Sequence, residues 1–78
     1  MKTIKVCYFA SLRELVGKSE ETFTLEAPIS GEALWEALNQ TIELPASSLL
    51  AINHEYADLQ TLIHENDEVA FFPPVTGG

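Results

Sequence analysis

The part of the sequence best suited to covalent chemistry is its last pair of residues, Gly77 and Gly78. The α-carboxylate of Gly78 has an ordinary pKa of about 3.3–3.7, so it is ionised at neutral pH and is a poor electrophile until it is activated. Adenylation by ATP would give it a good leaving group. Attack by sulfur would then yield a thiocarboxylate, whereas attack by a lysine amine would yield an isopeptide. Because glycine has no side chain, such an end can enter a channel too narrow for other residues.

The residues before this pair favour an extended tail over 73–78 (PPVTGG). Pro73 and Pro74 favour a polyproline-like path that leads the chain away from the folded body. Fully extended, residues 73–78 would reach about 20 Å, at roughly 3.3–3.6 Å per residue. We therefore expect a flexible tail that a partner can bind. The alternative is an inert, frayed end, since chain termini are often disordered.

The other potentially reactive side chains form weaker patterns. Cys7 lies within a predicted strand with only Lys5 nearby, which favours an ordinary strand cysteine over a sulfur relay. His54 and His64 do not have the spacing of zinc ligands, and the acidic residues of segment 65–68 lack the calcium-loop pattern. We therefore expect no metal site.

The charge of the chain restricts its partners. The 78 residues carry a formal charge of −8, from 12 acidic against 4 basic residues, and no Lys or Arg follows Lys18. Nucleic acid and anionic membranes would be repelled, whereas a basic protein surface would be attracted; the alternative is that the acidity only serves solubility. With one cysteine, no signal peptide and no membrane span, the sequence favours the cytoplasm.

Apolar and polar residues alternate in the segments that we predict as strands. In two other segments, apolar residues recur at the three- and four-residue spacing of a helix. Leu12, Leu15 and Val16 predict a short helix that Gly17 ends. A main helix begins after the N-cap Ser30, with Trp35 at the margin of its apolar stripe. That stripe comprises Leu34, Ala37, Leu38 and Thr41. Strands are expected at 2–9, 21–26, 49–52 and 68–72, with 53–58 turn-like and 59–63 ambiguous.

One main helix and a mixed sheet must cover each other to bury their apolar faces. The order strand, strand, helix, strand, strand therefore predicts an α+β roll of the β-grasp type. We expect residues 1–78 to form a single domain of this kind, ending in the tail. Alternation places Phe9 and Phe72 on the second face of the sheet, which predicts a binding surface. Alternatively, both rings pack under a loop.

Three stretches resemble the small subunits of molybdopterin synthase. Residues 67–78 (DEVAFFPPVTGG) resemble the C-terminal signature of that family, residues 4–17 (IKVCYFASLRELVG) its first strand and short helix, and residues 51–53 (AIN) a mid-chain element. The sequence departs from the family at His54, where many relatives have Gln or Gly, and at Cys7, where a larger aliphatic residue is usual.

The resemblance implies a ubiquitin-like β-grasp fold and a function as the sulfur carrier of a sulfurtransferase. Gly78 would be adenylated by an enzyme of the ubiquitin-activating type and converted to a thiocarboxylate by a sulfur donor. It would then deliver sulfur to a cyclic pyranopterin monophosphate in the large subunit, and two deliveries would build the dithiolene of molybdopterin. The assembly would be a heterotetramer of two large and two small subunits. The chain itself would bind no cofactor, and ATP would be used by the activating enzyme.

The expected partner-binding residues are Phe9, Tyr56, Phe72, Pro73, Pro74, Val75, Thr76 and Gly77. Three other functions stay open. The chain could carry sulfur for thiazole biosynthesis, although that family usually lacks the Phe-Phe-Pro-Pro approach to the tail. It could be a protein modifier joined to lysines through Gly78, or an interaction module with an inert tail.

Overall fold

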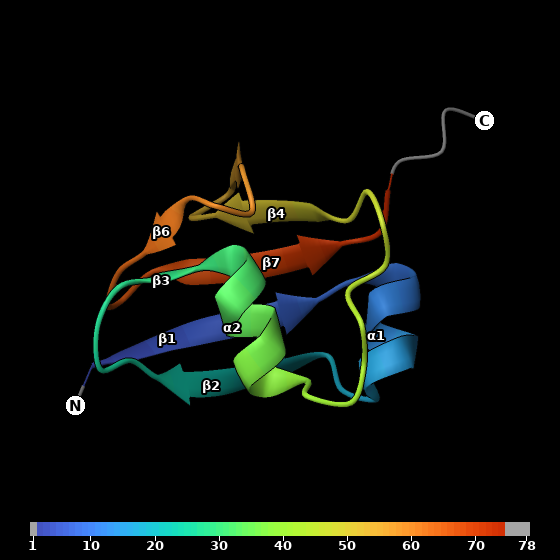
Figure 1. The fold of residues 1–78 in the computed structure, drawn as a ribbon, viewed down its shortest axis with the longest axis horizontal. Helices are drawn as coiled ribbons and strands as arrows, with labels where there is room; N and C mark the ends of the chain where they lie inside the picture. The colour runs from blue at the N-terminus through green and yellow to red at the C-terminus, as the bar shows by residue number, and fades with distance from the viewer. Residues whose placement is uncertain (1, 75–78) are drawn as a thin grey trace.

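Two strands from opposite ends of the sequence form the centre of the main sheet in the computed structural model, which describes residues 2–74. Strands β1 (Thr3–Tyr8) and β7 (Glu68–Phe72) pair in parallel, with Val6 beside Val69 and Tyr8 beside Phe71. Both run in the same direction, so their last residues lie at the same end of the sheet (Figure 1).

Antiparallel strands flank this central pair. Strand β2 (Glu20–Thr24) pairs with β1, and β4 (Leu49–Ile52) pairs with β7. Strand β5 (Glu55–Ala57) completes the order β2-β1-β7-β4-β5. The segment 53–58 was expected to be turn-like, and this prediction was wrong for the residues of β5. The ambiguous segment 59–63 contains β6 (Leu62–Ile63), which pairs with β3 (Ile29–Ser30) in a second, two-stranded sheet.

Helix α2 (Gly31–Leu38) lies across one face of the main sheet (Figure 1). As predicted, Ser30 is its N-cap, and the Ser30 hydroxyl oxygen accepts a hydrogen bond from the backbone N–H of Ala33 at 3.2 Å. The helix ends one turn earlier than its apolar pattern suggested, so Thr41 lies outside it. Trp35 was predicted at the margin but is fully buried.

The short helix α1 (Ala10–Val16) follows β1 directly. Gly17 ends it in the left-handed conformation, with φ 88°, as the sequence indicated. Leu12 is buried, but Leu15 is 46 % exposed, so the expected apolar stripe is narrower than predicted. Leu12 is the buried side chain of α1, and the partly buried Val16 also packs against the core.

The core lies between α2 and the inner face of the main sheet. Gly31 allows α2 to begin close to β4, because a Cβ atom there would lie 2.5 Å from the Cδ2 atom of Leu50. The buried cluster consists of Ile4, Val6, Tyr8, Leu12, Leu25, Leu34, Trp35, Leu50, Ile63, Val69 and Phe71. This arrangement is the predicted α+β, β-grasp fold, with two helices. No helix within residues 2–74 is long and apolar enough to cross a membrane.

Candidate functional site

Side chains alternate between the two faces of the central strands, and only one face is covered by α2. On β7, Val69 and Phe71 enter the core, whereas Ala70 and Phe72 lie on the opposite, outer face. Phe9, the residue after β1, is 45 % exposed and lies beside Phe72. The structure therefore places Phe9 and Phe72 on the second face of the sheet, as the alternation predicted.

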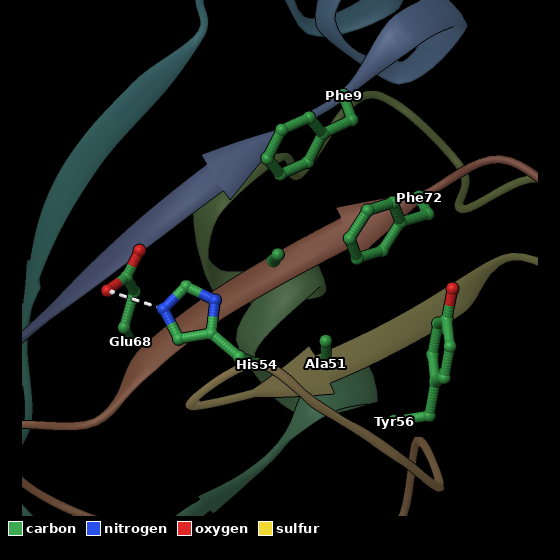
Figure 2. Close-up of a pocket in the computed structure, with 7 residues that line it drawn as sticks. Phe9, Ala51, His54, Tyr56, Glu68 and Phe72 are labelled. Atoms are coloured by element: carbon green, nitrogen blue, oxygen red, sulfur yellow. Dashed lines mark ion pairs between the residues drawn. The ribbon is translucent and has the colours of Figure 1, made fainter.

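Three aromatic rings gather on the outer face (Figure 2). Phe9 and Phe72 are stacked, with ring centroids 4.8 Å apart and planes inclined by 4°. Tyr56, from β5, lies with its ring centroid 6.1 Å from that of Phe72 and is 73 % exposed. We call Phe9, Tyr56 and Phe72 the aromatic patch. The exposure of Phe9 argues against the alternative in which Phe9 and Phe72 pack under a loop.

A shallow depression of about 210 Å³ lies beside the aromatic patch. Its lining includes the small residues Ala51 and Ala70, which pair across β4 and β7. Opposite the rings, His54 Nε2 lies 3.7 Å from Glu68 Oε1 (Figure 2). Sequence reasoning did not place these four residues in the site. The alternation of β7 could have placed Glu68 and Ala70, since both share a face with Phe72.

The position of His54 depends on a tight turn between β4 and β5. Asn53 and His54 both have positive φ values, 52° and 70°, which non-glycine residues adopt at a cost in free energy. The Asn53 side chain holds the turn: its Nδ2 donates to Asp67 Oδ1 at 2.9 Å, and its Oδ1 accepts from the Glu68 backbone N–H at 2.9 Å. The pKa of Asp67 is lowered, first by the hydrogen bond from the His64 backbone N–H and then by Asn53.

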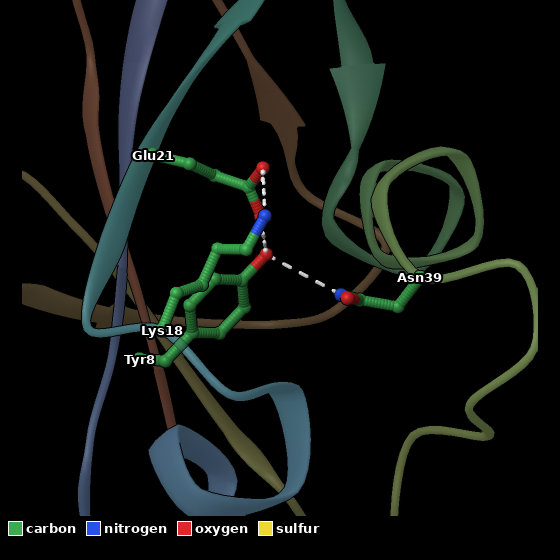
Figure 3. Close-up of polar contacts among 4 residues, drawn as sticks. All are labelled: Tyr8, Lys18, Glu21 and Asn39. Atoms are coloured by element: carbon green, nitrogen blue, oxygen red, sulfur yellow. Dashed lines mark hydrogen bonds and ion pairs between the residues drawn. The ribbon is translucent and has the colours of Figure 1, made fainter.

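Strand β1, which leads to Phe9, is fixed on its inner face by Tyr8 (Figure 3). The buried Tyr8 hydroxyl donates to Glu21 Oε2 at 2.6 Å and accepts from Asn39 Nδ2 at 3.3 Å. Lys18 Nζ lies 3.3 Å from the other oxygen of Glu21. The network joins β1 to Glu21 of β2 and to Asn39, the residue that ends α2. Both side chains hold the end of β1 just before Phe9.

The thiol of Cys7 lies on the outer face but is poorly suited to act as a nucleophile. Partial burial raises the pKa of Cys7; Glu68 and Glu20 also raise it, and Lys5 lowers it. A raised pKa reduces the fraction of thiolate at neutral pH, and the thiolate is the reactive form. Within residues 2–74, no three His, Cys, Asp or Glu side chains come together as a metal-binding group.

The start of the tail borders the aromatic patch. Pro73 and Pro74 follow Phe72 directly and, with Phe9 and Tyr56, line a second shallow depression. The remaining predicted tail residues, Val75, Thr76, Gly77 and Gly78, lie outside the described residues. A protein that covers the aromatic patch would therefore also contact the point from which the tail leaves the sheet.

Comparison with known sequences gives matches along nearly the whole chain. The sequence model of the ThiS family matches residues 6–78. The chain is 38 % identical to the molybdopterin synthase sulfur carrier subunit of Escherichia coli, covering 96 % of this chain and 99 % of that protein. It is 34 % identical to the protein of the same name from Haemophilus influenzae, with the same shares covered.

Comparison with solved structures finds the same fold. A putative molybdopterin converting factor, subunit 1, from Pyrococcus furiosus superposes with a TM-score of 0.76 at 26 % identity, covering 96 % of this chain and all of the other. The small archaeal modifier protein 1 of Haloferax volcanii superposes with a TM-score of 0.75 at 23 % identity, again covering 96 % of this chain and all of the other.

Proposed function

The chain belongs to the ThiS family, and from this premise we propose that it is the sulfur carrier subunit of a molybdopterin synthase, acting through Gly78. The observation that carries the proposal is its full-length similarity to bacterial proteins named as such subunits. The family match extends to residue 78 and therefore includes the terminal Gly77 and Gly78.

The proposed reaction begins with the carboxylate of Gly78. Its oxygen attacks the α-phosphate of ATP on an activating enzyme, which gives an acyl adenylate and releases pyrophosphate. A sulfur donor equivalent to hydrosulfide then forms the carbon–sulfur bond and displaces AMP, which leaves a thiocarboxylate. Because the charge of the carboxylate is removed in the adenylate, the carbonyl carbon becomes electrophilic enough for this attack.

The thiocarboxylate then delivers sulfur in the large subunit. Its sulfur forms a bond to a carbon of the cyclic pyranopterin monophosphate while a carbon–oxygen bond at that carbon breaks, and the oxygen leaves as water or with the phosphate. Water then cleaves the bond between Gly78 and sulfur to restore the carboxylate. Two such deliveries supply both sulfur atoms of the dithiolene. In this scheme the chain acts as a recyclable carrier, and the large subunit supplies the substrate pocket within a heterotetramer of two large and two small subunits.

The aromatic patch supports a docking role for the outer face. Exposed aromatic rings are enriched in protein interfaces, and here they border the residues that begin the tail. Residues 73–78 could extend about 20 Å from the sheet, at 3.3–3.6 Å per residue, which would carry Gly78 into a pocket of the docked partner. The net charge of −8 favours association with a partner whose surface is basic.

Intact-mass spectrometry tests the proposal directly. The chain is incubated with its activating enzyme, ATP and sulfide, and we expect a mass increase equal to one sulfur replacing one oxygen, located at Gly78 by fragmentation. A variant that lacks Gly78 is the control and should gain no sulfur. Reconstitution with the large subunit and the pterin substrate should then form molybdopterin only with the full chain.

Three further observations separate the other functions. Conjugates of higher mass that vanish when Gly78 is removed would indicate a protein modifier. A deletion strain that requires thiamine but keeps its molybdoenzyme activity would indicate the thiazole pathway. Full activity of a chain that lacks Gly77 and Gly78 would contradict every function that acts through the tail.

A further inference from the structure

The depression beside the aromatic patch has two chemically different walls. The rings of Phe9, Phe72 and Tyr56 form one wall, and the imidazole of His54, with the carboxylate of Glu68 beside it, lies on the other side (Figure 2). Aromatic faces carry partial negative charge and attract cations within about 6 Å, with arginine used most often in proteins. The rings and the Glu68 carboxylate therefore both favour a positively charged group in the depression.

The carboxylate of Glu68 is available for a new partner. Its side chain is 43 % exposed, and its ion pair with the imidazole of His54 is long, at 3.7 Å, and is charged only when His54 is protonated. Lys5 lies beside Glu68 in the register of β1 and β7. Its Nζ nevertheless forms an ion pair with Glu20, at 3.5 Å, and not with Glu68. Among the ion pairs of residues 2–74, none joins Glu68 to Lys or Arg.

A purely apolar occupant would fit this site less well. It would remove water from the Glu68 carboxylate without replacing the lost hydrogen bonds, and an uncompensated carboxylate is costly to bury. A guanidinium offers a planar group for stacking and N–H donors for the carboxylate. The alkyl stem of an arginine could lie over Ala51 and Ala70, whose small side chains leave the space of the depression.

The described residues leave no lysine or arginine engaged with Glu68. No Lys or Arg follows Lys18 in the sequence, so β4, β5 and β7 supply none, and Lys5 of the neighbouring β1 forms its ion pair with Glu20. We infer that the depression between the aromatic patch and Glu68 binds an arginine side chain of the protein that docks on the outer face. The inference deepens the proposed function and rests on it for the identity of the docking protein.

The side-chain preference can be measured without that protein. The full ¹⁵N-labelled chain is titrated with Nα-acetyl-arginine methylamide and, separately, with its neutral isostere Nα-acetyl-citrulline methylamide, while the amide signals of Ala51 and Ala70 are followed by NMR. We expect saturable shifts with the arginine compound and an affinity about threefold to fivefold above that for the citrulline compound, as for an exposed cation–π contact. Glu68→Gln should remove most of this preference.

Glu36→Gln is the matched control, because it makes the same change of charge on α2, away from the depression. It should leave the preference for arginine intact. Equal affinity for both compounds, or the absence of saturable shifts at Ala51 and Ala70, would overturn the inference.

The docking protein provides the second measurement. With the molybdopterin synthase large subunit, Glu68→Gln should weaken binding at least about tenfold in calorimetry, whereas Glu36→Gln should change it less. If the large subunit binds and Gly78 accepts sulfur but Glu68→Gln binds as tightly as the unmodified chain, the inference fails and the proposed function stands. If the large subunit does not bind but the arginine preference is observed, the pocket stands and the proposed function fails.

Discussion

The two faces of the central strands use the same residue types for opposite purposes. Phe71 and Phe72 are neighbours in the sequence, yet Phe71 is 0 % exposed beneath α2, whereas Phe72 lies on the outer face with Phe9 and Tyr56. The inner rings pack within a closed core, with Phe71 5.2 Å from Trp35 between centroids. The outer rings have no such cover within residues 2–74. Alternation along one strand therefore separates rings that build the core from rings that stay accessible to a partner.

The largest expected effect comes from the inner face. Phe71→Ala should lower the free energy of unfolding by about 3–5 kcal/mol, because it removes a fully buried ring and leaves a cavity. Since small domains are typically stable by only about 5–15 kcal/mol, a sizeable part of the protein could then be unfolded. Chemical denaturation measures the change. A loss below about 1 kcal/mol would show that this face does not maintain the fold.

Substitution of the adjacent residue, Phe72, on the outer face should affect partner binding more than the free energy of unfolding. Phe72→Ala should weaken binding of the large subunit by about 2 kcal/mol, a typical value for an aromatic hot spot. It should change the free energy of unfolding far less than Phe71→Ala, because the ring lies on the uncovered face. Calorimetry and denaturation on the same sample test both expectations. Unchanged affinity, or a loss of stability equal to that of Phe71→Ala, would break the comparison.

A smaller effect is expected from the polar group of the inner face. Tyr8→Phe should cost about 1–2 kcal/mol of stability, because it leaves Glu21 and the buried Asn39 without their shared partner. Denaturation at neutral pH measures this loss, and Tyr56→Phe, on the exposed outer face, is the matched control.

We expect Tyr8 to make the free energy of unfolding depend on pH. Burial, followed by the hydrogen bond to Glu21, raises the pKa of Tyr8 above its ordinary value, although Asn39 opposes the shift. A raised pKa in the folded state means that the stabilisation is complete below about pH 10, the ordinary tyrosine pKa, and is lost as pH rises through the folded pKa. The unfolding free energy should therefore fall above about pH 10, and this fall should be smaller in Tyr8→Phe. If the unfolding free energies of the unmodified chain and Tyr8→Phe fell equally above about pH 10, Tyr8 would not be the source of this pH dependence.

Local patterns were sufficient to predict the two faces. The period of two placed Phe9 and Phe72 on the same face of the sheet, and the structure agrees. Ser30 and Gly17 were correctly identified as helix boundaries, because their capping interactions involve only neighbouring residues. These features depend on a few consecutive residues and are therefore visible in the sequence.

Features that depend on distant contacts were missed. Trp35 is buried because its ring meets Tyr8 and Phe71 edge to face and its indole N–H donates to the Ile42 carbonyl at 2.8 Å. Strand β5 was missed because the turn before it is Asn53–His54, whereas the strongest hairpin signal is Asn-Gly. The side-chain bonds of Asn53 to the turn before β7 are long-range and cannot be read from local spacing.

The parallel pairing of β1 with β7 also affects how the protein is made. Residues 5–8 can find their neighbours at 68–71 only after more than sixty further residues, up to residue 71, have been synthesised. Pairing between such distant segments slows folding, because a long loop must close before the contacts form. A nascent chain interrupted before β7 would lack a central strand, so it could neither close its core nor assemble the aromatic patch. In this way the topology would keep incomplete chains from competing for the partner.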